Sequence, residues 1–110
     1  PTPASPPAEP SRERKKQFEA EVRRHKRAVD AMRARIAELE GRISEGEAAI
    51  KALEVTMSAP GFYEDHVASK PGLDRHQAQM WEVGDLMNRW EMLQQEAAAL
   101  EAQAPRPPGA

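Results

Sequence analysis

The sequence contains no cysteine and few aromatic residues. Of its 110 residues, 5% are aromatic and 31% are charged, and the mean hydropathy is -0.79. The absence of cysteine excludes a disulfide-stapled fold, a Cys-ligated zinc site and a thiol nucleophile. A small globular domain needs a core of large apolar side chains, and this chain has few of them. The composition therefore argues against a compact globular domain.

The chain also lacks long apolar runs and phosphate-binding loops. No apolar stretch approaches the ~20 residues of a membrane span, and no N-terminal signal peptide is evident. The six glycines never form a GxxxxGK[ST] loop. We therefore expect a non-catalytic, cytoplasmic segment that has no metal, cofactor or membrane partner of its own. Because the sequence begins at Pro1 without an initiator Met, we also expect it to be part of a longer protein.

The ten prolines divide the chain. Five lie in the first ten residues, three lie in the last six, and only Pro60 and Pro71 lie between. Proline has no amide donor and clashes with the preceding helical turn, so it is excluded from helix interiors. The pattern predicts a linker over residues 1–10, helices over 11–59 and 72–104, a turn over 60–71, and a tail over 105–110.

The first predicted helix carries a repeat with an average spacing of 3.5 residues. Alternate steps of four and three from Phe18 to Met57 reach an apolar residue at ten of twelve positions, the exceptions being His25 and Gly46. This spacing is typical of a coiled-coil seam. The positions are Phe18, Val22, His25, Val29, Met32, Ile36, Leu39, Ile43, Gly46, Ile50, Leu53 and Met57.

The second predicted helix continues the repeat with one defect. The seam runs from Leu73 to Ala104, but Met80, Val83 and Leu86 are separated by two consecutive steps of three, which predicts local overwinding. Two helices joined by a short turn bury their seams by folding back on each other. The predicted fold is all-α, an antiparallel two-helix coiled-coil hairpin. We expect Gly46 to leave a gap in the first seam, facing residues 81–85.

Positive charge gathers at the start of the first helix. Residues 12–27 hold eight Lys and Arg against three Glu, whereas residues 28–110 hold eight basic and fourteen acidic residues. Because the second helix is shorter, this segment is predicted to overhang it. A basic segment on an acidic body indicates an encounter with a polyanion such as RNA or DNA. Its candidate contacts are Arg12, Arg14, Lys15, Lys16, Arg23, Arg24, Lys26 and Arg27.

The aromatic and histidine side chains are assigned to packing. We expect Phe62 and Tyr63 to close the tip of the hairpin and Trp90 to lie in the seam, with an aromatic tip that touches a partner as the rival interpretation. A histidine at a seam position is more often a polar residue that sets register than a metal ligand. This is how we interpret His25 and His76.

Several motifs together resemble the C-terminal coiled-coil extension of ABC-F proteins. These are a basic helix start, the heptads of MRARIAELEGRI, the turn SAPGFYED and the segment RWEMLQ around Trp90, covering residues 11–103. The resemblance implies a parent ATPase with two ATP-binding cassettes, which would hold ATP and Mg²⁺. It also implies partners among ribosomal RNA, transfer RNA and DNA, and a role in translation. Other members carry a proline in the first helix, which this chain lacks.

Two alternatives compete with nucleic-acid binding. The hairpin could be a structural tether that packs on its own ATPase cassettes. It could also be an adaptor that homodimerises, because β-branched residues alternate with Leu39 and Leu53 along the first seam. An intramolecular hairpin stays monomeric on dilution, whereas an adaptor of this kind does not.

Overall fold

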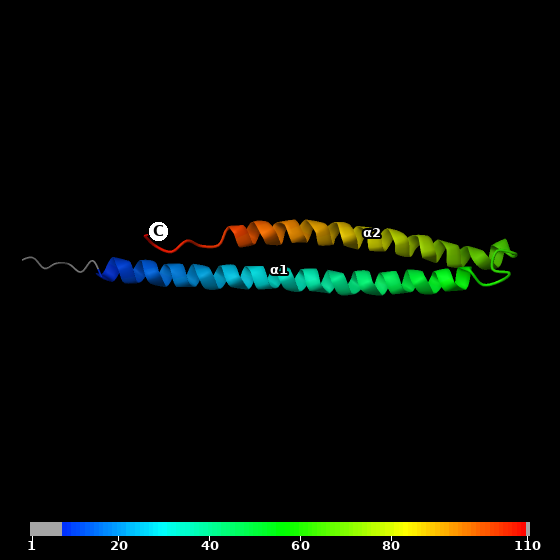
Figure 1. Cartoon of the computed structure of the whole chain (residues 1–110), viewed down its shortest axis with the longest axis horizontal. Helices are drawn as coiled ribbons and strands as arrows, with labels where there is room; N and C mark the ends of the chain where they lie inside the picture. The colour runs from blue at the N-terminus through cyan, green and yellow to red at the C-terminus, as the bar shows by residue number, and fades with distance from the viewer. Residues whose placement is uncertain (1–7, 110) are drawn as a thin grey trace, which may run out of the picture. The chain divides into compact units, whose positions relative to one another are not determined.

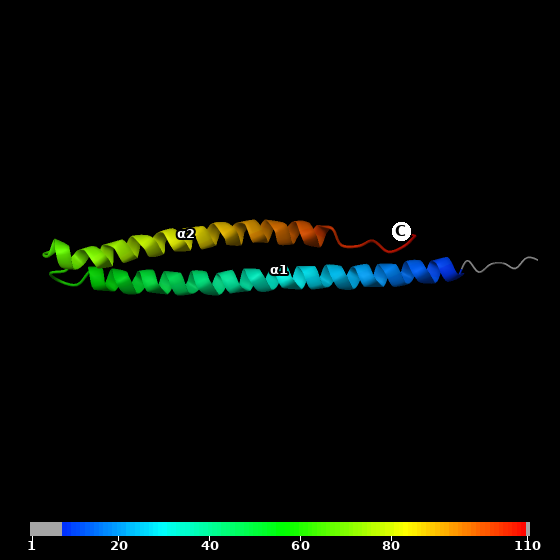
Figure 2. The ribbon, with the colours of Figure 1, turned by 180° about the vertical axis from the view of Figure 1, so that it is seen from behind.

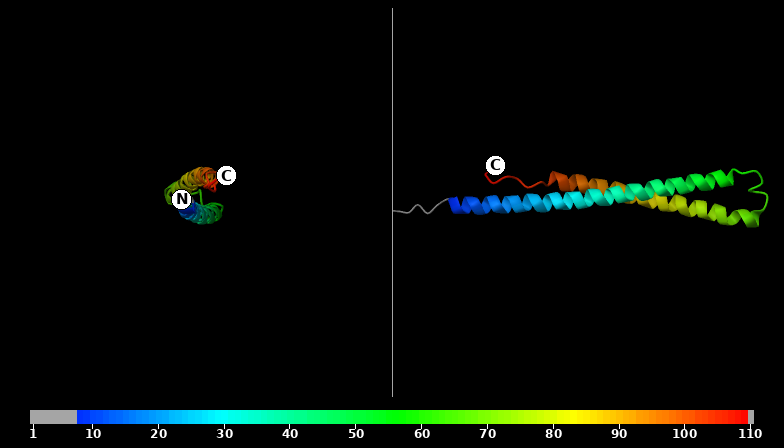
Figure 3. Two further views of the ribbon diagram at one scale, coloured as in Figure 1. Left: turned by 90° about the vertical axis from the view of Figure 1, so that its left-hand side faces the viewer. Right: turned by 90° about the horizontal axis from the view of Figure 1, so that it is seen from below.

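In the computed structural model, which describes residues 8–109, the chain forms two α-helices, α1 (Ala8–Met57) and α2 (His66–Ala102). No strand occurs in that range. The chain divides into two compact units. We call Pro1–Ala34 with Gln95–Ala110 the terminal unit, and Arg35–Gln94 the turn unit. In the turn unit the two helices run alongside each other and are joined at one end (Figure 1, Figure 2), and they cross in the right-hand view of Figure 3.

The pairing of the helices is antiparallel, which confirms the predicted helical hairpin. In the turn unit, Glu54 on α1 meets His76 on α2, and Glu40 meets Trp90. Partner numbers therefore rise on α2 as they fall on α1. Ile36, Leu39, Val83 and Leu86 form the core of this unit, with exposures of 8% or less.

Burial along α1 follows the predicted seam. Eleven of the twelve seam residues are buried or half-buried, and Val22, with 39% of its surface exposed, is the exception. The charged side chains between them are exposed. The spacing of 3.5 residues thus identified the face of α1 that meets α2.

Burial along α2 corrects the predicted overwinding. Apart from half-buried Gln94, the covered positions alternate in steps of three and four, so Gln79 and not Met80 lies in the seam. Met80 is 53% exposed and Leu73 36% exposed. The prediction failed because small or polar residues occupy part of the seam while apolar residues lie beside it. The alternating covered positions are Ser69, Gly72, His76, Gln79, Val83, Leu86, Trp90, Leu93, Ala97 and Leu100.

Gly46 makes room for a close approach of the two helices in the turn unit. A Cβ atom on Gly46 would lie 2.5 Å from Cγ2 of Val83 and 3.9 Å from Oε1 of Gln79. The predicted gap therefore faces residues 81–85, as expected, and Val83 fills it.

The turn between the helices begins with the Pro60-Gly61 pair. The amide of Phe62 donates to the carbonyl of Ala59 at 3.2 Å, and Gly61 has a φ of 82°. Proline followed by a glycine with positive φ is the arrangement of a type II turn. The turn predicted at these two residues is confirmed.

The second helix begins at His66, six residues before the predicted start at Gly72. Asp65 caps it: its Oδ1 accepts the amides of Val67 at 3.0 Å and Ala68 at 3.2 Å. Pro71 consequently lies inside α2, which contradicts the prediction of a turn over 60–71. Asp65 is the stronger start signal because its side chain satisfies two amides that have no partner within the helix. Lys70 and Asp74 form an ion pair across Pro71, with an Nζ–Oδ2 distance of 2.9 Å.

The outer ends of both helices also differ from the predicted bounds. α1 begins at Ala8, so Pro10 lies in its first turn, where amides have no acceptor within the helix and proline removes no hydrogen bond. Residues 1–7 of the predicted linker lie outside the described range. α2 ends at Ala102 and closes with bonds from the amides of Gln103 and Ala104 to the carbonyls three residues earlier. Ala104 precedes Pro105, which disfavours a helical conformation.

Candidate nucleic-acid interface

The eight predicted basic contacts all lie on α1 within the terminal unit, and all eight side chains are exposed. Lys26 pairs with Asp30, with an Nζ–Oδ2 distance of 2.7 Å. Among residues 11–109, whose side chains are described, the other seven make no ion pair. Their charges are therefore not neutralised by neighbouring carboxylates.

Six of these eight residues share one side of the helix. An α-helix turns by about 100° per residue, so these six fall within about 120° of its circumference. The same arc contains Glu19 and Asp30, and Arg14 and Arg24 lie outside it. We call the six residues the basic face: Arg12, Lys15, Lys16, Arg23, Lys26 and Arg27.

The C-terminal tail lies along the start of α1, as Figure 1 shows. Pro108 and Gly109 line a hollow together with Ser11, Arg14 and Lys15. The basic segment therefore extends beyond the last turn of α2, as predicted, but the tail accompanies it. No acidic residue follows Glu101, so the tail adds Arg106 and does not neutralise the segment.

Two contacts hold the last turn of α2 against α1 in the terminal unit. Nε2 of His25 donates to the carbonyl of Leu100 at 2.6 Å, because a carbonyl oxygen only accepts. Nε of Arg33 donates to Oε1 of Glu101 at 2.9 Å. His25 is half-buried, so it has the packing role that the sequence indicated, and it positions the region from which the tail departs.

The two aromatic residues assigned to the hairpin tip, Phe62 and Tyr63, and Trp90, assigned to the seam, lie in different surroundings. Phe62 is half-buried, and its ring would be 3.2 Å from a Cβ on Gly72. Tyr63 is 55% exposed and meets Phe62 edge to face at a centroid distance of 4.9 Å. Trp90 is half-buried away from the turn, and its Nε1 donates to Oε2 of Glu40 at 3.1 Å.

The described residues 8–109 contain no cluster of three or more His, Asp or Glu suited to holding a metal ion. Nor does either helix have a stretch long and apolar enough to cross a membrane.

The pKa of Lys70 is raised by its hydrogen bond to Asp74 and by the attraction of that carboxylate. The ion pair therefore contributes to the stability of the fold at pH values below the ordinary lysine pKa. This stability is lost as the pH rises through the raised pKa.

Two features of the surface were not predicted from the sequence. An apolar row on α2, Leu73, Met80 and Met87, lies outside the seam, with exposures of 36%, 53% and 51%. A repeat that starts from Ser69 places Gly72, Gln79 and Leu86 in the seam, and the apolar row is then the set of residues that follow these three. The tail's position along α1 has no signal in the sequence, because proline-rich composition does not indicate where a segment packs.

Comparison with known proteins gives one match. The family model described as the ABC transporter C-terminal domain matches residues 22–95. No curated protein and no solved structure matches the chain. The matched range takes in part of the basic segment, the turn and most of α2.

Proposed function

The chain belongs to the ABC transporter C-terminal domain family, and from this premise we propose that it binds nucleic acid for an ABC-F type ATPase. Family membership makes it an accessory domain of an ABC protein. In this proposal ATP and Mg²⁺ are bound by cassettes elsewhere in the parent protein, and the hairpin contributes contacts to ribosomal RNA, transfer RNA or DNA.

The observation that carries the proposal is the basic face. Its six cationic side chains are exposed and fall on one side of α1. A helix that presents cations along one side follows the backbone of a duplex, where phosphates are regularly spaced. Contacts of this kind fix the position of a protein and do not read sequence. Binding is therefore expected to be sensitive to salt and tolerant of sequence.

The charge of the two units supports the same orientation. The terminal unit holds ten Lys and Arg against seven Asp and Glu, a net charge of +3, and the turn unit holds six against eleven, a net charge of −5. A polyanion is attracted to the first unit and repelled by the second. Nucleic acid is thus expected to contact the terminal unit.

The test replaces four residues of the basic face, Arg12, Lys16, Arg23 and Arg27, with Glu. Affinity for an RNA duplex is measured by fluorescence anisotropy at about 50 and 200 mM salt. We expect the variant to bind more than about tenfold more weakly at low salt. Its plot of log affinity against log salt should be shallower by about three or four, roughly one for each lost phosphate contact.

The matched control applies the same change of charge to the turn unit, at Arg35, Arg42, Arg75 and Arg89. Circular dichroism of the two variants should show that both keep their helices. If the control loses as much affinity as the first variant, binding follows net charge and not the basic face. If the first variant binds like the unaltered chain, the proposal is wrong.

A further inference from the structure

An apolar row runs along α2 outside the seam. Leu73, Met80 and Met87 are seven residues apart and are 36%, 53% and 51% exposed. Each follows a seam position by one residue. Pairing with one partner helix requires only the seam, and a wider apolar face is typical of a helix that packs on more than one neighbour.

An acidic row accompanies it on α1. Glu40, Glu47 and Glu54 are also seven residues apart and are exposed. Met87 lines a groove of about 310 Å³ with Glu40, Glu47 and three further residues, Ile43, Ser44 and Trp90. The two rows therefore border the same edge of the turn unit. We call this edge, formed by the apolar and the acidic row, the methionine edge.

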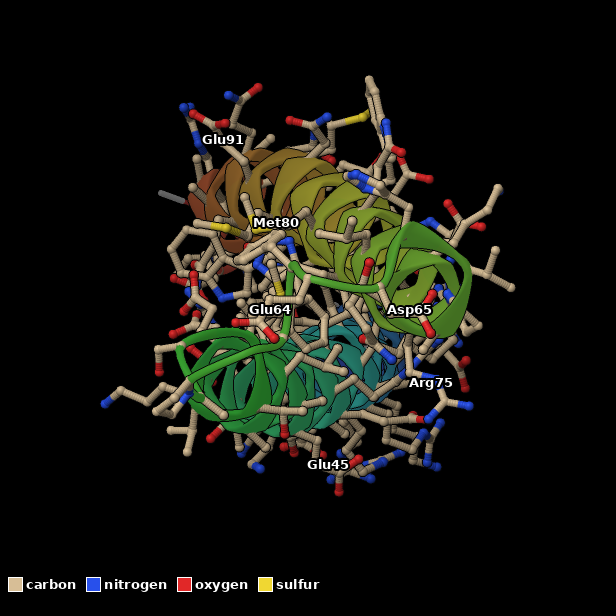
Figure 4. The ribbon with its side chains drawn as sticks, turned by 90° about the vertical axis from the view of Figure 1, so that its right-hand side faces the viewer. Glu45, Glu64, Asp65, Arg75, Met80 and Glu91 are labelled. Carbon is tan, nitrogen blue, oxygen red and sulfur yellow. The ribbon has the colours of Figure 1, made fainter. Side chains whose placement is uncertain are left out.

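The other edge of the turn unit carries arginines. A groove there is bordered by three arginines, Arg35, Arg42 and Arg89, and one acidic residue, Glu38, with Met92 beside them. In Figure 4, Met80 lies on one side of the hairpin, and Arg75 and Glu45 lie on the other. Arginines thus border the groove on this edge, whereas the groove on the methionine edge is lined by Glu40 and Glu47 and by no cation.

We propose that the methionine edge binds a partner α-helix whose apolar side chains recur every seven residues and are bordered by Lys or Arg. Apolar side chains of such a helix would cover Leu73, Met80 and Met87, and its cations would pair with the glutamates. From Leu73 to Met87 the row is about 21 Å long, so a helix of about four turns spans it. Methionine adapts its shape to a partner surface, which suits a docking site.

The charge of this edge decides between possible occupants. Carboxylates repel nucleic acid, so the edge is not a second phosphate-binding surface. A second copy of the chain packed edge to edge would bring glutamates against glutamates. A purely apolar helix would cover carboxylates without pairing them, which is unfavourable. The proposal does not rest on nucleic-acid binding, because it concerns the turn unit alone.

The probe is a fluorescein-labelled helical peptide of about 24 residues, with Leu at the seam positions and Lys at the flanking positions. A second peptide has Glu in place of every Lys. Anisotropy is measured with the full chain at about 150 mM NaCl. We expect the Lys peptide to bind and the Glu peptide to bind at least about tenfold more weakly.

Substitutions in the chain locate the site. Met80→Glu with Met87→Glu is expected to weaken the Lys peptide by about tenfold or more. Met92→Glu serves as the matched control, because Met92 is 62% exposed and borders the arginine groove. The affinity of this variant for the Lys peptide should stay within about twofold of that of the unaltered chain. Glu47→Lys, which leaves the apolar row intact, should weaken the Lys peptide and strengthen the Glu peptide.

Three results would overturn the proposal. The first is equal binding of the two peptides, and the second is an equal loss of affinity in Met92→Glu. The third is self-association of the chain that Met80→Glu abolishes in sedimentation, which would make a second copy the occupant. Binding of RNA by the same variants is measured in parallel and should not change, so failure here is separable from failure of the proposed function.

Discussion

Gly46 determines how closely the helices approach each other in the turn unit. Glycine within a helix is normally unfavourable by about 0.5 to 1 kcal/mol relative to alanine. At this position the lost propensity is offset by contact, because Val83 occupies the space that a Cβ would need and is itself only 7% exposed. Valine in a helix has one strongly preferred rotamer, so it cannot easily turn aside.

Gly46→Ala is therefore expected to destabilise the chain in spite of the higher helix propensity of alanine. Overpacking a close contact lowers stability by about 1 to 3 kcal/mol, so a net loss of about 1 kcal/mol in the free energy of unfolding is expected. Urea denaturation followed by circular dichroism measures it. Gly41→Ala is the control, since nothing lies within 4 Å of a Cβ there, and it should gain about 0.5 to 1 kcal/mol.

The residue scale also shows where sequence patterns were sufficient and where they were not. The seam of α1 could be read directly because apolar residues fill most of it. The seam of α2 could not, because polar Gln79 lies inside it while Met80 beside it is exposed. A hydrophobic count prefers Met80, but in the structure it is Gln79 whose Oε1 reaches the seam, 3.9 Å from the place of a Cβ on Gly46.

At the scale of elements, the start of α2 depends on one side chain. Asp65 accepts two amides at the first turn, while Pro71 follows within the same helix. Sequence rules weighted proline as a barrier and placed the start six residues too late. The cap could have been recognised from Asp65 alone, but its strength relative to proline depends on which amides the side chain reaches.

Asp65→Ala should lower the free energy of unfolding by about 1 kcal/mol, because two amides at the start of α2 lose their acceptor. Asp65→Asn retains an oxygen at the same place and should keep most of this stability. Thermal unfolding of both variants gives the comparison. Glu64→Ala removes a neighbouring exposed carboxylate and should have little effect; a loss equal to that of Asp65→Ala would argue against the cap.

At the scale of the whole molecule, charge and pairing follow the division into units. Within each unit a part of α1 lies against a part of α2 of the same chain, so the seams are covered without a second chain wherever the two helices pair. Sequence composition revealed the charge difference. It could not reveal that the tail runs along the basic segment, since this depends on contacts of Pro108 and Gly109.

The midpoint of thermal unfolding is accordingly expected to be independent of protein concentration. Unfolding of a homodimer shifts to higher temperature with concentration, whereas unfolding of a monomeric hairpin does not. Scans at about 5 and 500 µM distinguish the two cases. A shift of several degrees would favour the dimerising adaptor over the intramolecular hairpin.

The fit of Val83 against Gly46 fixes the register in which the two helices of the hairpin pair. Deleting one heptad from each helix between this contact and the turn leaves every seam residue opposite its present partner. Deleting a heptad from α1 alone would bring Val83 opposite Leu39, a buried position with no space for it. The two arms of this hairpin can therefore lengthen or shorten only together and in steps of seven residues, which constrains insertions in the chain and any redesign of its reach.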